Sequence, residues 1–206
     1  MNHHYGVTDE TRNILTTMIG RELRSYLSTD EEKRHNSYTT FALRFDDEDV
    51  EFTTKEIAHV ADWFDELNTA EILQHPKRDI QWPTGKWMNV RQPDGTVNKV
   101  KRPSFYEIPV DKTVTAISVA ISTLSRDASK SKFGGESGAV DYIRAVVLHF
   151  GDDVLVFDKG PMFWSEIWDI KWCKRGEISF PVEDTSKEYP EYTSSVQLEH
   201  FPCTDK

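Results

Sequence analysis

Cysteine is scarce in this chain of 206 residues, which contains only Cys173 and Cys203. Two distant thiols exclude a disulfide framework and a cysteine-rich zinc site, because both need several cysteines at close spacing. Long hydrophobic runs are also missing, since no stretch approaches the ~20 apolar residues that a membrane-spanning helix needs. The first residues lack the basic and apolar regions of a secretory signal. We therefore expect a cytoplasmic protein that does not insert into membranes.

Sequence motifs for metal or phosphate chemistry are missing as well. The seven histidines are scattered, and none stands at the spacing of a His-Glu-x-x-His ligand set. The glycine-containing stretch 133–139 has neither the Gly-x-Ser-x-Gly spacing of a serine nucleophile nor the Lys-Ser/Thr of a phosphate loop. We interpret this stretch as a flexible loop, and we predict no metal and no cofactor.

Large apolar side chains are present in sufficient number for a folded core. Six Trp, seven Tyr and eleven Phe supply bulky packing groups, which excludes a disordered class for the body of the chain. The formal net charge is -10. A charge of this sign disfavours nonspecific binding to nucleic acid or anionic lipid, and it favours solubility and attraction to a basic partner.

Hydropathy patterns predict an antiparallel, β-rich α+β fold with two helices. Thr8 and two acids precede apolar residues at helical spacing, which predicts a short N-terminal helix over 9–19. Apolar residues recur at helical spacing between Ile57 and Leu67, so we expect an amphipathic helix over 54–73 that ends before Pro76. Alternating segments predict strands at 21–27, 38–45, 50–52, 87–90, 96–100, 110–122, 142–150, 154–157, 178–182 and 195–201.

Two segments of the sequence resemble each other. Residues 43–63 align without gaps on 148–168, where random pairing gives about one identity. Five pairs are identical: Leu43 and Leu148, Phe45 and Phe150, Asp47 and Asp152, Phe52 and Phe157, Trp63 and Trp168. Upstream, 19–23 align on 110–114. The pattern favours internal duplication of a three-stranded meander, each copy covering the apolar face of the other. Coincidence between two ordinary hairpins is the alternative.

The meander halves suggest three parts within one compact unit: a first half over 1–75, a proline-rich hairpin insert over 76–109, and a second half with C-terminal strands over 110–206. Seven cations and two acids give residues 77–102 a charge of +5, which leaves -15 on the rest of the chain. Lys99, Lys101, Arg102 and Trp87 are candidate contacts, since cations neutralise phosphates and rings stack on bases. The alternative is that this hairpin pairs with the protein's own acidic surface.

Two acidic turns provide further candidate binding residues, namely Asp46, Asp47, Glu48 and Asp49 in the first half and Asp152 and Asp153 in the second. Aspartates favour turns without any ion, and the first turn lacks the glycine and distal glutamate of a calcium loop. We therefore interpret both as hairpin turns whose acids contribute to an acidic face.

Acid–base chemistry has three alternative candidates. Glu166 and Asp169 lie near Trp164, Trp168 and Trp172, which is the composition of a carboxylate pair in an aromatic cleft. The tryptophan spacing also suits one buried helical stripe. His59 falls on the expected second helix, where an exposed histidine is the simpler interpretation. His149 alternates with Leu148 and Phe150 on a strand, and we expect it to face solvent.

The function that these observations favour is a non-enzymatic protein-binding module. An acidic inhibitor acting on a basic partner fits, such as an immunity protein that neutralises a toxin or an antidefence protein that mimics nucleic acid, because opposite charges accelerate association. The alternatives are a hydrolase with carboxylates in an aromatic cleft and a nucleic-acid contact through 77–102. A homodimer is also compatible with two halves that pair across chains.

Overall fold

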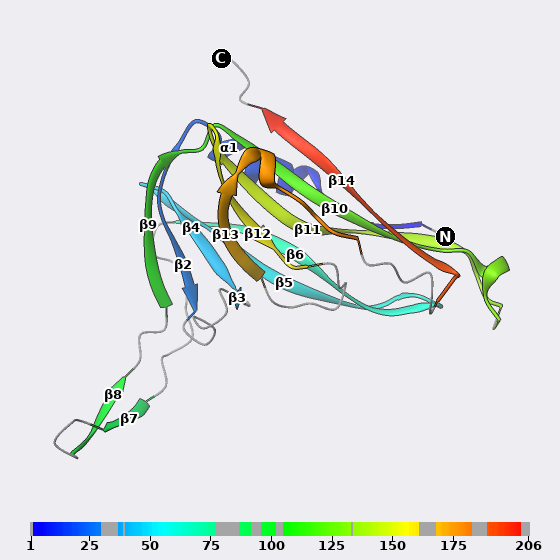
Figure 1. Ribbon diagram of the computed structural model, residues 1–206, viewed down its shortest axis with the longest axis horizontal. Helices are drawn as coiled ribbons and strands as arrows, with labels where there is room; N and C mark the ends of the chain where they lie inside the picture. Colours follow the sequence, from blue (N-terminus) through cyan, green and yellow to red (C-terminus); the bar gives the residue numbers. More distant parts are fainter. Residues whose placement is uncertain are drawn as a thin grey trace.

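The structure is a computed structural model that describes residues 2–29, 37–38, 40–76, 87–91, 96–101, 105–132, 134–160, 168–182 and 189–202. Within these ranges, mainly antiparallel strands form two large sheets, and α1 (Asp9–Met18) is the one α-helix (Figure 1). The expected β-rich α+β class is therefore observed. No helix in the described part of the chain has the length and apolar character needed to cross a membrane.

The larger sheet has the strand order β14-β10-β11-β12-β13-β3, with β1 parallel to β11. Its strands are β1 (Asn2–Tyr5), β3 (Ser37–Tyr38), β10 (Ala116–Arg126), β11 (Gly138–Phe150), β12 (Asp153–Asp158), β13 (Trp168–Lys174) and β14 (Tyr192–Pro202). The smaller sheet has the order β6-β5-β4-β2-β9. Its strands are β2 (Glu22–Thr29), β4 (Phe41–Arg44), β5 (Glu48–Ala61), β6 (Phe64–Pro76) and β9 (Phe105–Thr113).

A separate hairpin and two short helical turns complete the described fold. β7 (Trp87–Arg91) and β8 (Val97–Lys101) pair with each other as an antiparallel hairpin, as the two strand predictions at 87–90 and 96–100 indicated. Two short 3₁₀ turns, η2 (Ala128–Lys130) and η3 (Arg175–Glu177), follow β10 and β13. The N-terminal helix agrees with its prediction: the Thr8 hydroxyl accepts a hydrogen bond from the Thr11 N–H and caps α1.

The amphipathic helix expected over 54–73 is wrong, because these residues form most of the long β5–β6 hairpin. His59 has a φ of 54° and lies where the strand register shifts, between Ala58 and Ala61. This irregularity and the turn at Asp62 and Trp63 each interrupt the two-residue alternation of side chains. The apolar residues of two strands therefore fall at a spacing that imitates one helical face.

Three strand predictions also need correction. The segment 38–45 is not one strand, because Tyr38 belongs to β3 of the larger sheet and residues 41–44 form β4 of the smaller sheet. The segment 110–122 is divided between the sheets, because β9 ends at Thr113 and β10 begins at Ala116. Val114 is fully buried between them, and its N–H donates to the Arg21 carbonyl at 2.9 Å. The segment 178–182 is not a strand; Ile178 and Phe180 instead pack on an outer patch of the larger sheet.

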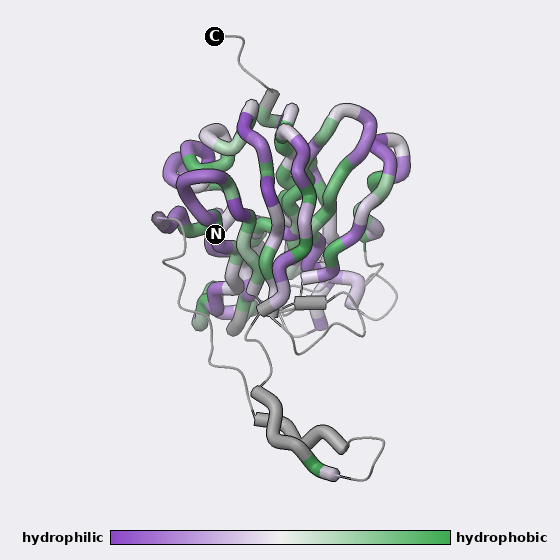
Figure 2. Tube along the Cα trace, turned by 90° about the vertical axis from the view of Figure 1, so that its left-hand side faces the viewer, coloured by the Kyte–Doolittle hydropathy of each residue, from purple (hydrophilic) through white to green (hydrophobic). Residues whose placement is uncertain are grey.

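The main core lies between the two sheets, and its centre is aromatic. Phe41 and Phe52 of the smaller sheet stack with Phe157 of the larger one, and Trp168 meets Phe41 edge-on. Figure 2 shows hydrophobic and hydrophilic residues interleaved along the strands of the body. The helix α1 closes one side of this core with three buried residues, Ile14, Leu15 and Met18.

The two sheets share one pairing pattern. β2, β4, β5 and β6 follow one another in the smaller sheet as β10, β11, β12 and β13 do in the larger. The registers also correspond: Leu43 pairs with Val50 as Leu148 pairs with Leu155, and Ser25 pairs with Arg44 as Ala116 pairs with His149. Of the five sequence identities, Trp63 with Trp168 is not structurally equivalent, because Trp63 lies in a turn and Trp168 within β13.

Candidate functional site

Three acids of the first acidic turn bind arginines of the same chain. Asp46 accepts a hydrogen bond from Arg24 Nε at 2.8 Å. Asp47 and Glu48 both pair with the Arg21 guanidinium, which also lies over the Phe45 ring. The hydrogen bond that Arg24 donates to Asp46 is the main cause that raises the pKa of Arg24. These acids therefore stabilise the turn, and most of their charge is compensated locally.

The fourth acid of that turn, Asp49, is fully buried. Its two carboxylate oxygens receive Arg44 Nε at 2.9 Å and Nη2 at 3.1 Å, a bidentate pair. Arg44 also reaches Glu107 at 3.2 Å, and the Asp49 hydrogen bond is the main cause that raises the pKa of Arg44. Asp49 is thus a structural residue of the smaller sheet and is not accessible to a partner.

The second acidic turn behaves similarly. Asp153 accepts hydrogen bonds from Lys174 Nζ at 2.6 Å and from Lys112 Nζ at 3.1 Å. These two ammonium groups, Lys174 first, lower the pKa of the Asp153 carboxyl. Asp152 is exposed, and its backbone carbonyl accepts the Arg175 N–H at 2.9 Å. Of the two acids, only Asp152 presents its carboxylate mainly to solvent.

Of the remaining predicted residues, only Asp169 and His59 have described side chains, and these two lie on different sheets. Asp169 and His59 are both exposed; Asp169 lies on β13, and His59 lies at the register shift of β5. Asp169 alternates with Trp168, whose ring is buried in the core, so the two side chains point to opposite faces. Trp87 lies on β7, and Lys99 and Lys101 lie on β8. Their side chains, together with Arg102 and Glu166, are outside the described residues.

The larger sheet contains a buried polar group that the sequence did not indicate. Ser118 Oγ lies 2.7 Å from His149 Nε2 and 2.8 Å from His200 Nδ1. This contact resembles a serine nucleophile with its base, but Ser118 is only 2% exposed. Its strand, β10, pairs on both edges with β11 and β14, so its backbone N–H groups are used in the ladders. The geometry therefore offers no oxyanion site for acyl transfer.

The strongest charge asymmetry lies on the β5–β6 hairpin. Residues 48–76 contain eight acids and one lysine, a formal charge of -7, whereas the other residues of the chain together carry -3. Near the turn, residues 56–70 contain four acids and no lysine or arginine. Glu56 and Asp62 are exposed. This feature is not apparent when 54–73 is interpreted as an amphipathic helix, because the exposed face of such a helix ordinarily carries charged side chains.

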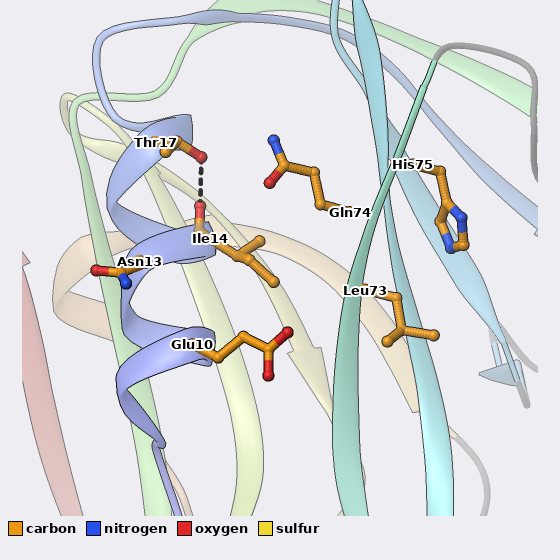
Figure 3. Close-up of a pocket in the computed structure, with 7 residues that line it drawn as sticks. All are labelled: Glu10, Asn13, Ile14, Thr17, Leu73, Gln74 and His75. Atoms are coloured by element: carbon orange, nitrogen blue, oxygen red, sulfur yellow. Dashed lines mark hydrogen bonds between the residues drawn. The ribbon is translucent and has the colours of Figure 1, made fainter.

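A groove lies between α1 and the base of this hairpin. It has a volume of about 620 Å³, and its lining comprises Glu10, Asn13, Ile14, Thr17, Leu73, Gln74 and His75. Figure 3 shows the Glu10 carboxylate and the Gln74 side chain directed into the space between helix and strand. None of the lining residues is a lysine or an arginine, so the groove suits a cationic side chain better than an anionic one.

His75 and Gln74 are held at this groove by the acids of β5. His75 Nε2 lies 2.8 Å from Glu51 Oε2, and the Gln74 amide donates to Glu48. Among the described strands, β6 is also the terminal strand of the smaller sheet, so one of its edges has no described neighbour in that sheet. Glu48 and Glu51 therefore fix the groove wall in place.

Comparison of the chain with models of known protein families, with curated proteins and with solved structures gives no match.

Proposed function

We propose that the protein is a non-enzymatic binding module that presents its acidic β5–β6 hairpin to a basic protein partner. The observation that supports this most directly is the charge near the hairpin turn, where residues 56–70 contain four acids and no lysine or arginine. The two acidic turns differ from the hairpin end, because most of their acids are paired with the protein's own arginines and lysines. The acids near the hairpin turn have no cation of their own segment to neutralise them.

A concentrated negative field of this kind accelerates association with a cationic protein and makes the rate depend on salt. The groove beside α1 supports the same partner class, since Glu10 offers a carboxylate to a lysine or arginine side chain that enters it. An inhibitor of the immunity or antidefence type remains the specific proposal, because such a protein works by covering the basic surface of its target.

The experiment is affinity capture from lysate of the source organism with the full chain as bait, washed at low and high salt. Glu56→Lys/Asp62→Lys reverses two exposed charges of the hairpin. Glu136→Lys/Asp152→Lys is the matched control, because it changes the net charge equally at two exposed positions elsewhere. We expect one stoichiometric protein that is lost at high salt and with the hairpin variant and is retained by the control.

The purified partner then permits a kinetic measurement. We expect the hairpin variant to lower the association rate constant at least tenfold at low salt, with a smaller effect on dissociation. Equal losses for the two variants would mean that only net charge matters, which contradicts a hairpin interface. Capture of no protein would contradict the binding function as a whole, and hydrolase assays would then be the next measurement.

We also propose that the two meanders arose by internal duplication. The matching strand orders and registers support it, as do four identities at equivalent positions: Leu43 and Leu148, Phe45 and Phe150, Asp47 and Asp152, Phe52 and Phe157. Sequences of related chains test this. If the two meanders arose by duplication, residues 41–52 and 146–157 should resemble each other more strongly in related chains whose sequences have diverged more slowly. Resemblance limited to the alternation of apolar residues would instead indicate two unrelated hairpins.

A further inference from the structure

The outer face of the larger sheet is covered by a segment that we call the strap, residues 175–182. Ile178 and Phe180 pack on the valine patch, which consists of Val147, Val154 and Val156. These valines alternate with residues of the main core and therefore lie on the opposite face of the sheet. The patch is buried, so the strap is its cover.

Hydrogen bonds near each end attach the strap to the sheet. Arg144 Nη1 donates to the Pro181 carbonyl at 2.7 Å, and the Arg144 guanidinium lies 5.5 Å from the Phe180 ring centre. At the other end, the Arg175 N–H donates to the Asp152 carbonyl at 2.9 Å. β11 and β12, in contrast, are held by continuous ladders. The strap is therefore the element that can separate while the sheet stays intact.

The expectation that His149 faces solvent is wrong, because His149 is buried on the same outer face, with only 4% of its surface exposed. One ring nitrogen, Nε2, shares a hydrogen bond with Ser118, but Nδ1 has no hydrogen-bond partner. Burial is the main cause that lowers the His149 pKa, and the charges of Arg175 and His200 lower it further. The neutral ring therefore fits this site, whereas an imidazolium would carry a buried N–H without an acceptor.

The neighbouring ionisable groups do not offset the cost of a buried, positively charged His149 ring. Arg175 and Glu177 lie on η3, His200 on β14, Lys171 and Cys173 on β13, and Asp152 in the adjoining turn. Burial raises the pKa of the Cys173 thiol, which therefore stays protonated and uncharged near neutral pH. The Glu177 carboxylate accepts the Lys174 N–H, which directs it to the end of β13. Asp152 is exposed.

We propose that the strap is an acid-sensitive cover: when His149 takes up a proton, residues 175–182 separate from the sheet and expose the valine patch. Separation removes the Arg175 charge from the ring and lets water reach Nδ1. The open state consequently binds the proton more tightly than the closed state. The closed state is fully favoured above the ordinary histidine pKa of about 6.5, and its advantage falls up to about tenfold for each pH unit below that value.

This inference does not depend on the proposed function, and hydrogen exchange of the full chain tests it. The protection of peptides spanning 173–182 is measured at pH 7.5 and pH 5.5 and corrected for intrinsic exchange rates. We expect protection to fall about tenfold at the lower pH. His149→Phe removes the titrating group and should abolish the change. His75→Gln, on the smaller sheet, is the matched control and should retain it.

Equal protection at the two pH values, or a pH response that persists in His149→Phe, would overturn the proposal. If the pH response were lost in His200→Gln but kept in His149→Phe, His200 would be the titrating group, and the proposal would equally be overturned. Because His149→Phe can fail to fold, the wild-type protein is also titrated by NMR. The His149 ring resonances and the Arg175 amide must then shift together at a pH below 6.5; separate midpoints would contradict a coupled opening.

Discussion

The rings of Phe41 and Phe157 stack face to face, with centroids 4.1 Å apart and planes inclined by 4°. Phe41 belongs to β4 of the smaller sheet and Phe157 to β12 of the larger, so this contact joins the two sheets directly. We expect Phe157→Ala to lower the free energy of unfolding by about 3–5 kcal/mol, because it leaves a cavity between layers that cannot collapse. Urea denaturation measures the difference.

Trp172→Ala is the control for that substitution, since it also truncates a large ring on the larger sheet but at a position 44% exposed. Its expected cost is below about 1 kcal/mol. Equal losses for the two variants would show that the aromatic stack does not couple the sheets.

The buried pair of Asp49 and Arg44 provides the second prediction. Asp49→Ala leaves the largely buried guanidinium of Arg44 without its bidentate partner, and the expected loss of stability is about 3–5 kcal/mol. Asp47→Ala removes an exposed acid of the same turn and should cost less than about 1 kcal/mol. Thermal unfolding followed by circular dichroism distinguishes them. Adding Arg44→Met to Asp49→Ala should recover part of the loss; no recovery would contradict an unpaired buried charge as its cause.

The third prediction concerns pH and Asp153. Hydrogen bonds from Lys174, and then from Lys112, lower the pKa of this carboxyl in the folded protein. The ionised form therefore stabilises the fold above the unfolded-state pKa, and that contribution is lost as pH falls through the lower folded-state value. Lys174→Met should raise the Asp153 pKa toward its ordinary value in an NMR titration. Lys130→Met, which removes a cation bound to Asp127 instead, should leave it unchanged.

Local chemistry made part of the fold predictable. The capping residue Thr8 and the apolar spacing of Ile14, Leu15 and Met18 predicted α1 correctly. The tight turn at Gly151 likewise predicted the β11–β12 hairpin, since Gly151 has a φ of 73° that glycine adopts without strain. In both cases a few neighbouring residues determine the structure, so periodicity and turn chemistry were sufficient.

The β5–β6 hairpin was missed because its pattern combines two strands. Side-chain alternation is interrupted at His59 and again at the turn. Apolar residues therefore recur at about the 3.6-residue period of a helix, although the segment is a pair of strands. Long-range pairing was equally invisible. No sequence pattern indicates that Arg21 and Arg24 bind the acids of a turn more than twenty residues away, or that Ile178 and Phe180 pack on valines of β11 and β12. The acidic face expected at the turns is therefore better placed on the hairpin.

The loop before β11, interpreted from its glycines as flexible, is organised by a buried arginine. Arg126 is 8% exposed, and its guanidinium donates to the carbonyls of Gly134 and Glu136 and to the Ser131 hydroxyl. A Cβ added at Gly135 would lie 2.8 Å from Arg126 Nη1, whereas one added at Gly134 would meet nothing within 4 Å. The two glycines thus form a matched pair for testing this arrangement.

Both glycines have a positive φ, 66° at Gly134 and 100° at Gly135, so alanine is strained at either position. Gly134→Ala should cost about 1 kcal/mol of stability through backbone strain alone. Gly135→Ala should cost at least twice as much, because it also displaces the guanidinium from its three acceptors and leaves a buried charge poorly satisfied. Urea denaturation gives the two values, and hydrogen exchange of residues 127–137 locates the change. If the loop were merely flexible, the two substitutions would cost the same and the exchange of this segment would not respond to either.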